Sequence, residues 1–162
     1  MFRIPRSSDS TAVVSIMNEA IEERRNAYLV PFSKEDGEKW FNELSGRARY
    51  MCIVEEDSIL GWGTLTDYRG GRGALSSSAE ITFYLGRTGR GKGLGKKLVS
   101  HLEEVALEQR IQHIIVILLD DNLPSQRLLH RMRYEVWANF EGIAHFPDGD
   151  RGHMYMGKHL IK

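Results

Sequence analysis

The segment from Gly86 to Lys97 has the composition of an anion-binding site. It contains five basic residues and no acidic ones, and glycines recur at positions 86, 89, 91, 93 and 95. Cations in the first turn of a helix oppose the positive end of its dipole, so they are unfavourable there unless an anion neutralises them. Closely spaced glycines let the backbone approach a ligand and direct its N–H groups at phosphate oxygens. We therefore expect a bound phosphate here rather than a flexible turn with solvated charges.

Two common phosphate-binding patterns fit this segment incompletely. The dinucleotide fingerprint G-x-G-x-x-G, started at Gly91 and Gly93, requires a third glycine where the chain has Lys96. The Walker pattern matches Gly86 and Lys92, but Gly93 takes the place of the serine or threonine that holds magnesium. Half of the chain also precedes the loop, whereas a P-loop enzyme normally carries it after the first strand. Both nucleotide alternatives are therefore disfavoured.

A third pattern, R/Q-x-x-G-x-G/A, is matched without a missing group by Arg90, Gly93 and Gly95. A second feature, the run from Asn122 to Ser125 followed by Leu128, lies at the distance at which one protein family carries it. On these two features the chain resembles the GCN5-related N-acetyltransferase superfamily, from about Ile4 to its end. Within that superfamily it is most similar to the phosphinothricin and amino-acid acetyltransferase branch.

The resemblance implies that the chain binds acetyl-CoA as its co-substrate through three segments. The backbone of Phe83, Tyr84 and Leu85 would pair with the pantetheine arm as an extra strand does. Asn122 and Ser125 would contact the cofactor from the opposite side, although plain helix capping explains them equally well. The pyrophosphate would lie on the loop formed by Arg90, Gly91, Lys92, Gly93, Leu94 and Gly95.

By the same resemblance, Glu80 would act as the catalytic base, directly or through water; the alternative is a solvent-facing carboxylate at the start of a strand. A base matters because a lysine-like amine is neutral only about once in a thousand molecules near neutral pH. Many family members carry a tyrosine acid where this chain has Leu129, and His130 points about 100° away from that position on a helix. The family glycine near this helix end is replaced by Arg133, which predicts a different helix ending.

The acceptor is less well defined by the sequence. Tyr28 and either Arg69 or Arg72 lie where this branch shapes its acceptor cleft, and an arginine there could bind a carboxylate, although a solvated loop charge fits as well. The resemblance implies acetyl transfer, by direct attack in a ternary complex, to the primary amine of an amino acid or an analogue such as phosphinothricin or methionine sulfoximine. The alternatives are a peptide or protein N-terminus, a polyamine, or a non-catalytic acyl-CoA-binding module.

The hydrophobic periodicity predicts the elements that position these residues. Periods of three to four residues indicate four helices, and alternating or continuous apolar runs indicate strands. The expectation is one acetyltransferase domain over residues 1–162, an α/β (α+β) fold with a mixed sheet of about six to seven strands and about four helices, in the order β-α-α-β-β-β-α-β-α-β-β. Helices are expected over 13–21, 33–44, 93–110 and 122–132, and strands over 50–55, 59–66, 79–85, 113–119, 134–140 and 154–160.

The composition excludes several classes of partner. The chain of 162 residues carries 22 Lys and Arg against 22 Asp and Glu, so it has no net charge with which to gather nucleic acid or an anionic membrane. Its six histidines lack metal-ligand spacing, so we expect no metal. The single Cys52 lies in an apolar run and predicts a buried thiol in a reducing compartment. A cytoplasmic protein, and a homodimer by the family resemblance, are the resulting expectations.

Overall fold

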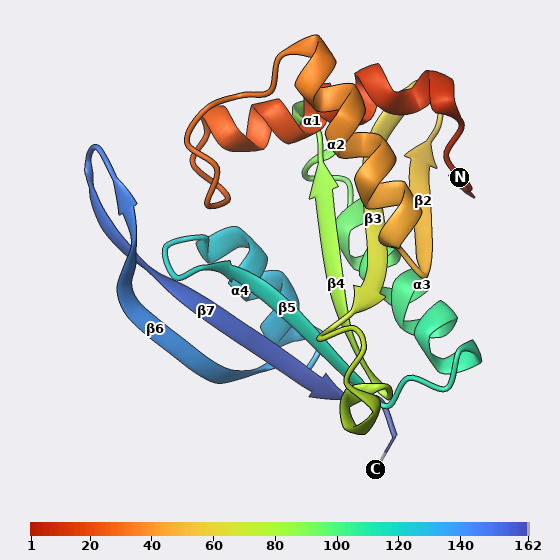
Figure 1. The fold of residues 1–162 in the computed structure, drawn as a ribbon, viewed down its shortest axis with the longest axis vertical. Helices are drawn as coiled ribbons and strands as arrows, with labels where there is room; N and C mark the ends of the chain where they lie inside the picture. The colour runs from red at the N-terminus through yellow and green to blue at the C-terminus, as the bar shows by residue number, and fades with distance from the viewer. Residues whose placement is uncertain (162) are drawn as a thin grey trace.

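The computed structural model describes residues 1–161, and these form one mixed sheet of seven strands in the order β1-β2-β3-β4-β5-β7-β6 (Figure 1). The predicted fold class, the number of helices and the order of elements are confirmed. The strands are β1 (Phe2–Arg3), β2 (Tyr50–Glu55), β3 (Ile59–Asp67), β4 (Ser78–Leu85), β5 (His113–Leu119), β6 (Glu135–Phe146) and β7 (Gly149–His159). The α-helices are α1 (Ser10–Glu22), α2 (Lys34–Arg47), α3 (Leu94–Glu108) and α4 (Leu123–Arg131).

Helices α1 and α2 pack on one face of the sheet. The apolar residues of α1 recur at helical spacing and are buried, and α2 buries Phe41 and Leu44. Ser33 caps α2, because its side chain accepts a hydrogen bond from the backbone N–H of Asp36 at 3.1 Å. Both helices share a buried cluster with Trp62 of β3. The face of β3 and β4 that carries Trp62 is therefore rich in buried apolar and aromatic side chains.

Helix α3 packs on the opposite face of the sheet. Its buried residues Leu98 and Leu102 share a cluster with Ile81 of β4. Gly63 of β3 permits this close packing, since a Cβ atom there would lie 2.8 Å from Leu102 Cδ1. Because side chains alternate along a strand, β4 directs its odd-numbered residues toward α3 and its even-numbered residues, Glu80 among them, toward α1 and α2.

The parallel strands β4 and β5 pair over only three residues and then separate. Their register runs from Ser78 opposite His113 to Glu80 opposite Ile115, yet β4 continues to Leu85 and β5 to Leu119. Figure 1 shows the two strands diverging from this short contact. Backbone N–H and C=O groups on the inner edges of both strands are left without a strand partner. This opening positions the candidate site.

Three local expectations can be compared directly with the structure. The C-terminal hairpin forms, but β6 and β7 are longer than predicted. The segment between β3 and β4, for which no helix or strand was predicted, includes a short 3-10 turn, Gly73–Leu75. The prediction of a different ending for α4 was wrong: Arg133 adopts φ +66°, the left-handed conformation for which glycine is the usual residue. An arginine can take this conformation at a cost in strain, so the helix ends without a glycine.

Cys52 is fully buried, so the prediction of a buried thiol is confirmed. Burial raises the pKa of this thiol to about 12. The described residues contain no helix that is both long and apolar enough to span a membrane.

Candidate active site

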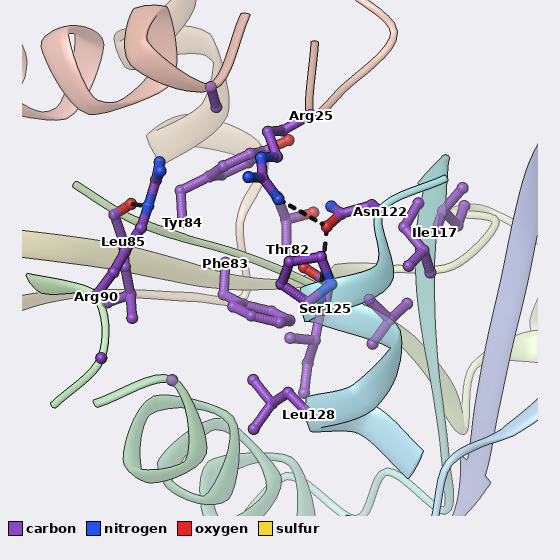
Figure 2. A pocket seen from close by; sticks show the side chains of 17 residues that line it. Arg25, Thr82, Phe83, Tyr84, Leu85, Arg90, Ile117, Asn122, Ser125 and Leu128 are labelled. Atoms are coloured by element: carbon purple, nitrogen blue, oxygen red, sulfur yellow. Dashed lines mark hydrogen bonds between the residues drawn. The ribbon is translucent and has the colours of Figure 1, made fainter. Parts of the chain in front are cut away.

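The opening between β4 and β5 forms a cavity of about 350 Å³ (Figure 2). Its walls come from β4, β5, the glycine-rich loop and the first turns of α4, with the end of α1 above them. Eight of the residues that the sequence assigned to the cofactor line it: Phe83, Tyr84, Leu85, Arg90, Gly91, Gly95, Asn122 and Ser125. The structure therefore brings together groups that are up to about forty positions apart in the chain.

The hydrogen-bonding pattern of β4 determines which backbone groups face this cavity. The N–H of Gly86 donates to the carbonyl of Leu60 at 2.9 Å, and Tyr84 lies opposite Trp62 two residues earlier. In an antiparallel pair, alternate residues direct both polar groups at the partner strand. Tyr84 thus bonds β3 through its backbone, whereas the backbone groups of Phe83 and Leu85 point toward the opening.

The glycine loop ends at the uncapped start of α3. Gly91 and Gly93 adopt φ +75° and +74°, and Gly93 is the N-cap residue without a side-chain cap. The first N–H groups of a helix have no intrahelical partner, so an uncapped start offers them to an anion. Gly95 allows α4 to approach, because a Cβ there would lie 3.0 Å from Leu128.

Three residues of the predicted phosphate loop do not line the cavity. Lys92 is exposed, Gly93 shapes the backbone, and Leu94 is buried in the core between α3 and the sheet. Leu94 therefore anchors the start of the helix through its side chain.

The Arg90 guanidinium braces the loop. Its Nε donates to the carbonyl of Leu85 at 3.0 Å, and its Nη1 donates to Glu23 Oε2 at 2.6 Å (Figure 2 shows the contact with Leu85). Arg87 also donates to Glu23, at 2.9 Å. Burial alone would raise the pKa of Glu23, but the ion pairs with Arg90 and Arg87 outweigh it and lower that pKa. The role of Glu23 gave no signal in the sequence, because only the fold brings the end of α1 to the loop.

The opposite wall begins at Asn122. Its Oδ1 accepts a hydrogen bond from the backbone N–H of Ser125 at 3.4 Å and a long one from Arg25 Nη1 at 3.5 Å (Figure 2). Helix capping is therefore one role of Asn122. Its position in the cavity wall is also compatible with a contact to the cofactor. Leu128 lines the cavity one turn further, whereas Leu129 is fully buried in the core and His130 is exposed outside it. Neither Leu129 nor His130 can deliver a proton to this site.

A second cavity of about 280 Å³ continues from the first toward α1 and α2. Glu80, which the sequence suggested as the base, and Tyr28, which it suggested as an acceptor residue, both line this second cavity. Burial raises the pKa of the Glu80 carboxyl, opposed by a hydrogen bond from Thr82 Oγ1 at 3.4 Å and by the charge of Arg47. Five residues line both cavities and form their junction: Arg25, Thr82, Tyr84, Ile117 and Leu118.

The acceptor arginines predicted from the sequence lie outside both cavities. Arg69 and Arg72 line a separate depression together with Arg49 and Asp67, and this depression shares no residue with either cavity. Sequence reasoning missed the cavity's own cations. Arg25 lies in the link after α1 and Arg47 at the end of α2, and only the tertiary structure brings both into the wall of this cavity.

The whole chain can be compared with known protein families and with individual relatives. The model of the Acetyltransferase (GNAT) family matches residues 14–134, a range that includes every lining residue of the first cavity and all but His153 of the second. The chain belongs to the GNAT acetyltransferase family. It is an acetyl-CoA-dependent N-acetyltransferase. Among the described residues, no group of three or more His, Cys, Asp or Glu side chains is placed to hold a metal ion.

Individual GNAT relatives match nearly the full chain. A Bacillus subtilis (strain 168) protein provisionally named as a phosphinothricin acetyltransferase, YwnH, is 30% identical over 151 residues, covering 92% of this chain and 91% of its own. An L-methionine sulfoximine/L-methionine sulfone acetyltransferase of Pseudomonas aeruginosa is 26% identical over 80% of this chain and 76% of its own. The fold of a Sinorhizobium meliloti phosphinothricin acetyltransferase, solved with AcCoA, superposes with a TM-score of 0.88 at 18% identity, covering 99% of this chain and 88% of that one.

Proposed function

We propose that this GNAT enzyme transfers the acetyl group of acetyl-CoA to the primary amine of a small amino acid or an analogue such as phosphinothricin or methionine sulfoximine. The observation that carries the proposal is the pair of contiguous cavities. One follows the exposed edge of β4 to the uncapped start of α3, and the other ends on a partly buried carboxylate, Glu80. Their junction is where a thioester and an amine would meet. The relatives named for phosphinothricin and methionine sulfoximine support this acceptor class.

The cofactor would follow the first cavity. The backbone groups of Phe83 and Leu85 that face the opening would pair with the amides of pantetheine, as an added strand pairs with a sheet edge; the Leu85 carbonyl would share its second lone pair, since it already accepts a hydrogen bond from Arg90. The pyrophosphate would accept hydrogen bonds from the N–H groups of the loop from Gly91 to Gly95, with Arg90 and Lys92 adding positive charge. Asn122 and Ser125 would contact the cofactor from the α4 side.

The reaction would proceed by direct attack at the cavity junction. Glu80 would accept a proton from the amine, which then attacks the thioester carbonyl. A backbone N–H of β4 that faces the opening, such as that of Phe83, can stabilise the oxyanion. Collapse breaks the carbon–sulfur bond, and the proton that the attacking nitrogen releases as it becomes an amide passes to the thiolate. Burial raises the pKa of Tyr84 to about 12, so its hydroxyl at the junction stays protonated and can donate a hydrogen bond to the leaving sulfur in the absence of a family tyrosine at Leu129.

A thiol-release assay tests this function. Acetyl-CoA is supplied with amino acids, methionine sulfoximine, phosphinothricin, polyamines and peptide N-termini in turn. We expect release with the amino acid analogues, identified as N-acetyl products by mass spectrometry, and no effect of a chelator. Stabilisation by acetyl-CoA in a thermal-shift assay without turnover on any amine would instead identify a non-catalytic acyl-CoA-binding module. Stabilisation by ATP and magnesium alone would contradict the assignment of the loop.

We also propose a homodimer in the cytoplasm. The edge strand β6 exposes a series of large apolar residues, and the single cysteine suits a reducing compartment. In a dimer, the loop that carries Arg69 and Arg72 could still contribute to acceptor binding, as the sequence predicted. Light scattering of the purified protein would measure the mass directly. The exposed residues on β6 are Val136, Trp137, Phe140 and Ile143.

A further inference from the structure

The second cavity, lined by Glu80 and Tyr28 and here called the acceptor cavity, contains two arginines that lack a close carboxylate partner. Arg25 has Glu23 as its nearest carboxylate, at 3.5 Å, and no ion pair of Arg47 occurs among residues 1–161. Other arginines of the same region are firmly paired: Arg90 approaches Glu23 to 2.6 Å and Arg87 approaches it to 2.9 Å. Arg25 and Arg47 are therefore the arginines of this region that remain available to bind an anion.

Arg25 lies at the point where the two cavities meet. It follows α1, and its side chain reaches toward the start of α4, where the long hydrogen bond to Asn122 holds it only loosely (Figure 2). It lines both cavities, whereas Arg47 lines only the acceptor cavity. A group on the acceptor that lies one carbon from the reacting amine must sit at this junction. Arg25 is the acceptor-cavity arginine that meets this condition.

Arg47 acts on the same cavity from the end of α2. Burial raises the pKa of Glu80, and the positive charge of Arg47 works against that rise, so the two groups are electrostatically coupled. With two arginines, one carboxyl and His153 in its wall, the cavity has an excess of positive charge. A second ammonium group on an acceptor would be repelled there, and a carboxylate would be attracted.

We propose that Arg25 binds the carboxylate next to the reacting amine, and that Arg25 and Arg47 together make the enzyme select amino acids over polyamines and over amines without an anionic group. An arginine can bind a carboxylate through two parallel hydrogen bonds, which also fixes the orientation of the neighbouring amine. Peptide N-termini lack a carboxylate at this position and are excluded on the same ground. This inference rests on the proposed function and names the specificity of the same site.

The test compares methionine sulfoximine with its methyl ester, which keeps the amine and the side chain and removes the negative charge. Values of kcat/KM are measured for the wild type and for Arg25→Gln, Arg47→Gln and Lys39→Gln. Lys39 is an exposed cation on the same helix as Arg47, lines no cavity described above, and is the matched control for the loss of one positive charge. The KM for acetyl-CoA and the circular dichroism spectrum report whether each variant keeps its donor site and its fold.

We expect Arg25→Gln to lower kcat/KM about tenfold to hundredfold for the acid and to leave the ester nearly unchanged, so that the preference for the acid collapses. Arg47→Gln should raise the relative rate with putrescine and shift the acidic limb of the pH profile to higher pH, because Glu80 loses a neighbouring positive charge. Lys39→Gln should keep the wild-type preference and pH profile.

Three results would overturn the inference. Equal losses on acid and ester in Arg25→Gln would show a structural role for that side chain. A collapsed preference in Arg72→Gln, but not in Arg25→Gln, would place the carboxylate on the loop after β3. Absence of thiol release by the wild type with any amine would overturn the proposed function itself, and it is distinguished from the other two results because those require turnover.

Discussion

Replacing the partly buried carboxylate of Glu80 by the neutral amide of glutamine tests the chemistry of the site most specifically. Glu80→Gln keeps the shape of the side chain and removes its ability to accept a proton. With an acceptor amine of pKa near 8, about 10% of the molecules are neutral at pH 7 and about 90% at pH 9, so the need for a base falls about tenfold over this range. A general base contributes about a hundredfold or more to the rate. We expect losses in kcat/KM of about a hundredfold at pH 7 and about tenfold at pH 9.

The assay is thiol release from acetyl-CoA with methionine sulfoximine, measured from pH 6 to pH 9.5 at fixed ionic strength. Glu56→Gln, in the exposed turn between β2 and β3, removes the same charge far from the base and serves as the control. A loss that stays constant over the whole pH range would refute proton transfer to Glu80 and leave it a structural role. Unchanged activity would remove it from the mechanism.

The same substitution should also affect stability in a pH-dependent way. Burial raises the pKa of Glu80 in the folded protein above its unfolded value, so the folded state binds more protons in the interval between them. The ionised carboxyl therefore destabilises the fold increasingly as the pH rises through this interval, and it has no such effect below the unfolded pKa. We expect Glu80→Gln to have a higher Tm than the wild type at pH 8 and a similar Tm at pH 4. A lower Tm at pH 8 would contradict this reasoning.

Three further substitutions or treatments test the surrounding structure. Cys52, whose thiol pKa is raised to about 12 by burial, should resist a thiol reagent at pH 8 until the protein is denatured; rapid labelling of the native protein would contradict its burial. Arg133→Gly should raise the free energy of unfolding by about 0.5–1 kcal/mol, because Arg133 has φ +66°, while Arg131→Gly within α4 should lower it by about 1 kcal/mol in the same denaturant titration. Gly93→Ala, at φ +74°, should cost about 1–2 kcal/mol and raise the KM for acetyl-CoA; an unchanged KM would argue against backbone binding of the pyrophosphate.

The sequence was most informative where local chemistry determines structure. The alternating glycines before an amphipathic segment predicted the loop and the start of α3, and the apolar run from His113 to Leu119 matched β5 residue for residue. The predicted start of the second helix at position 33 agrees with the structure, in which Ser33 caps α2. These features depend on backbone freedom, side-chain period and one hydrogen bond, all of which are encoded within a few positions.

The sequence was least informative where separate elements meet. The separation of β4 from β5 leaves no local signal, because both strands read as ordinary apolar runs. The pairing of Arg90 with Glu23 joins residues 67 positions apart, and the direction of Arg25 toward Asn122 joins residues 97 positions apart. The sequence therefore predicted acceptor arginines on the loop after β3, whereas the second cavity is lined by Arg25 and Arg47.

We propose that acetyl-CoA binds between β4 and β5 with its thioester at the junction of the two cavities. A crystal structure with coenzyme A and methionine sulfoximine tests it most directly. We expect the pantetheine amides to pair with the backbone of Phe83 and Leu85 and the pyrophosphate to bind the N–H groups from Gly91 to Gly95. The acceptor amine should face Glu80. Pantetheine bound outside this opening, or an acceptor amine directed away from Glu80, would contradict it.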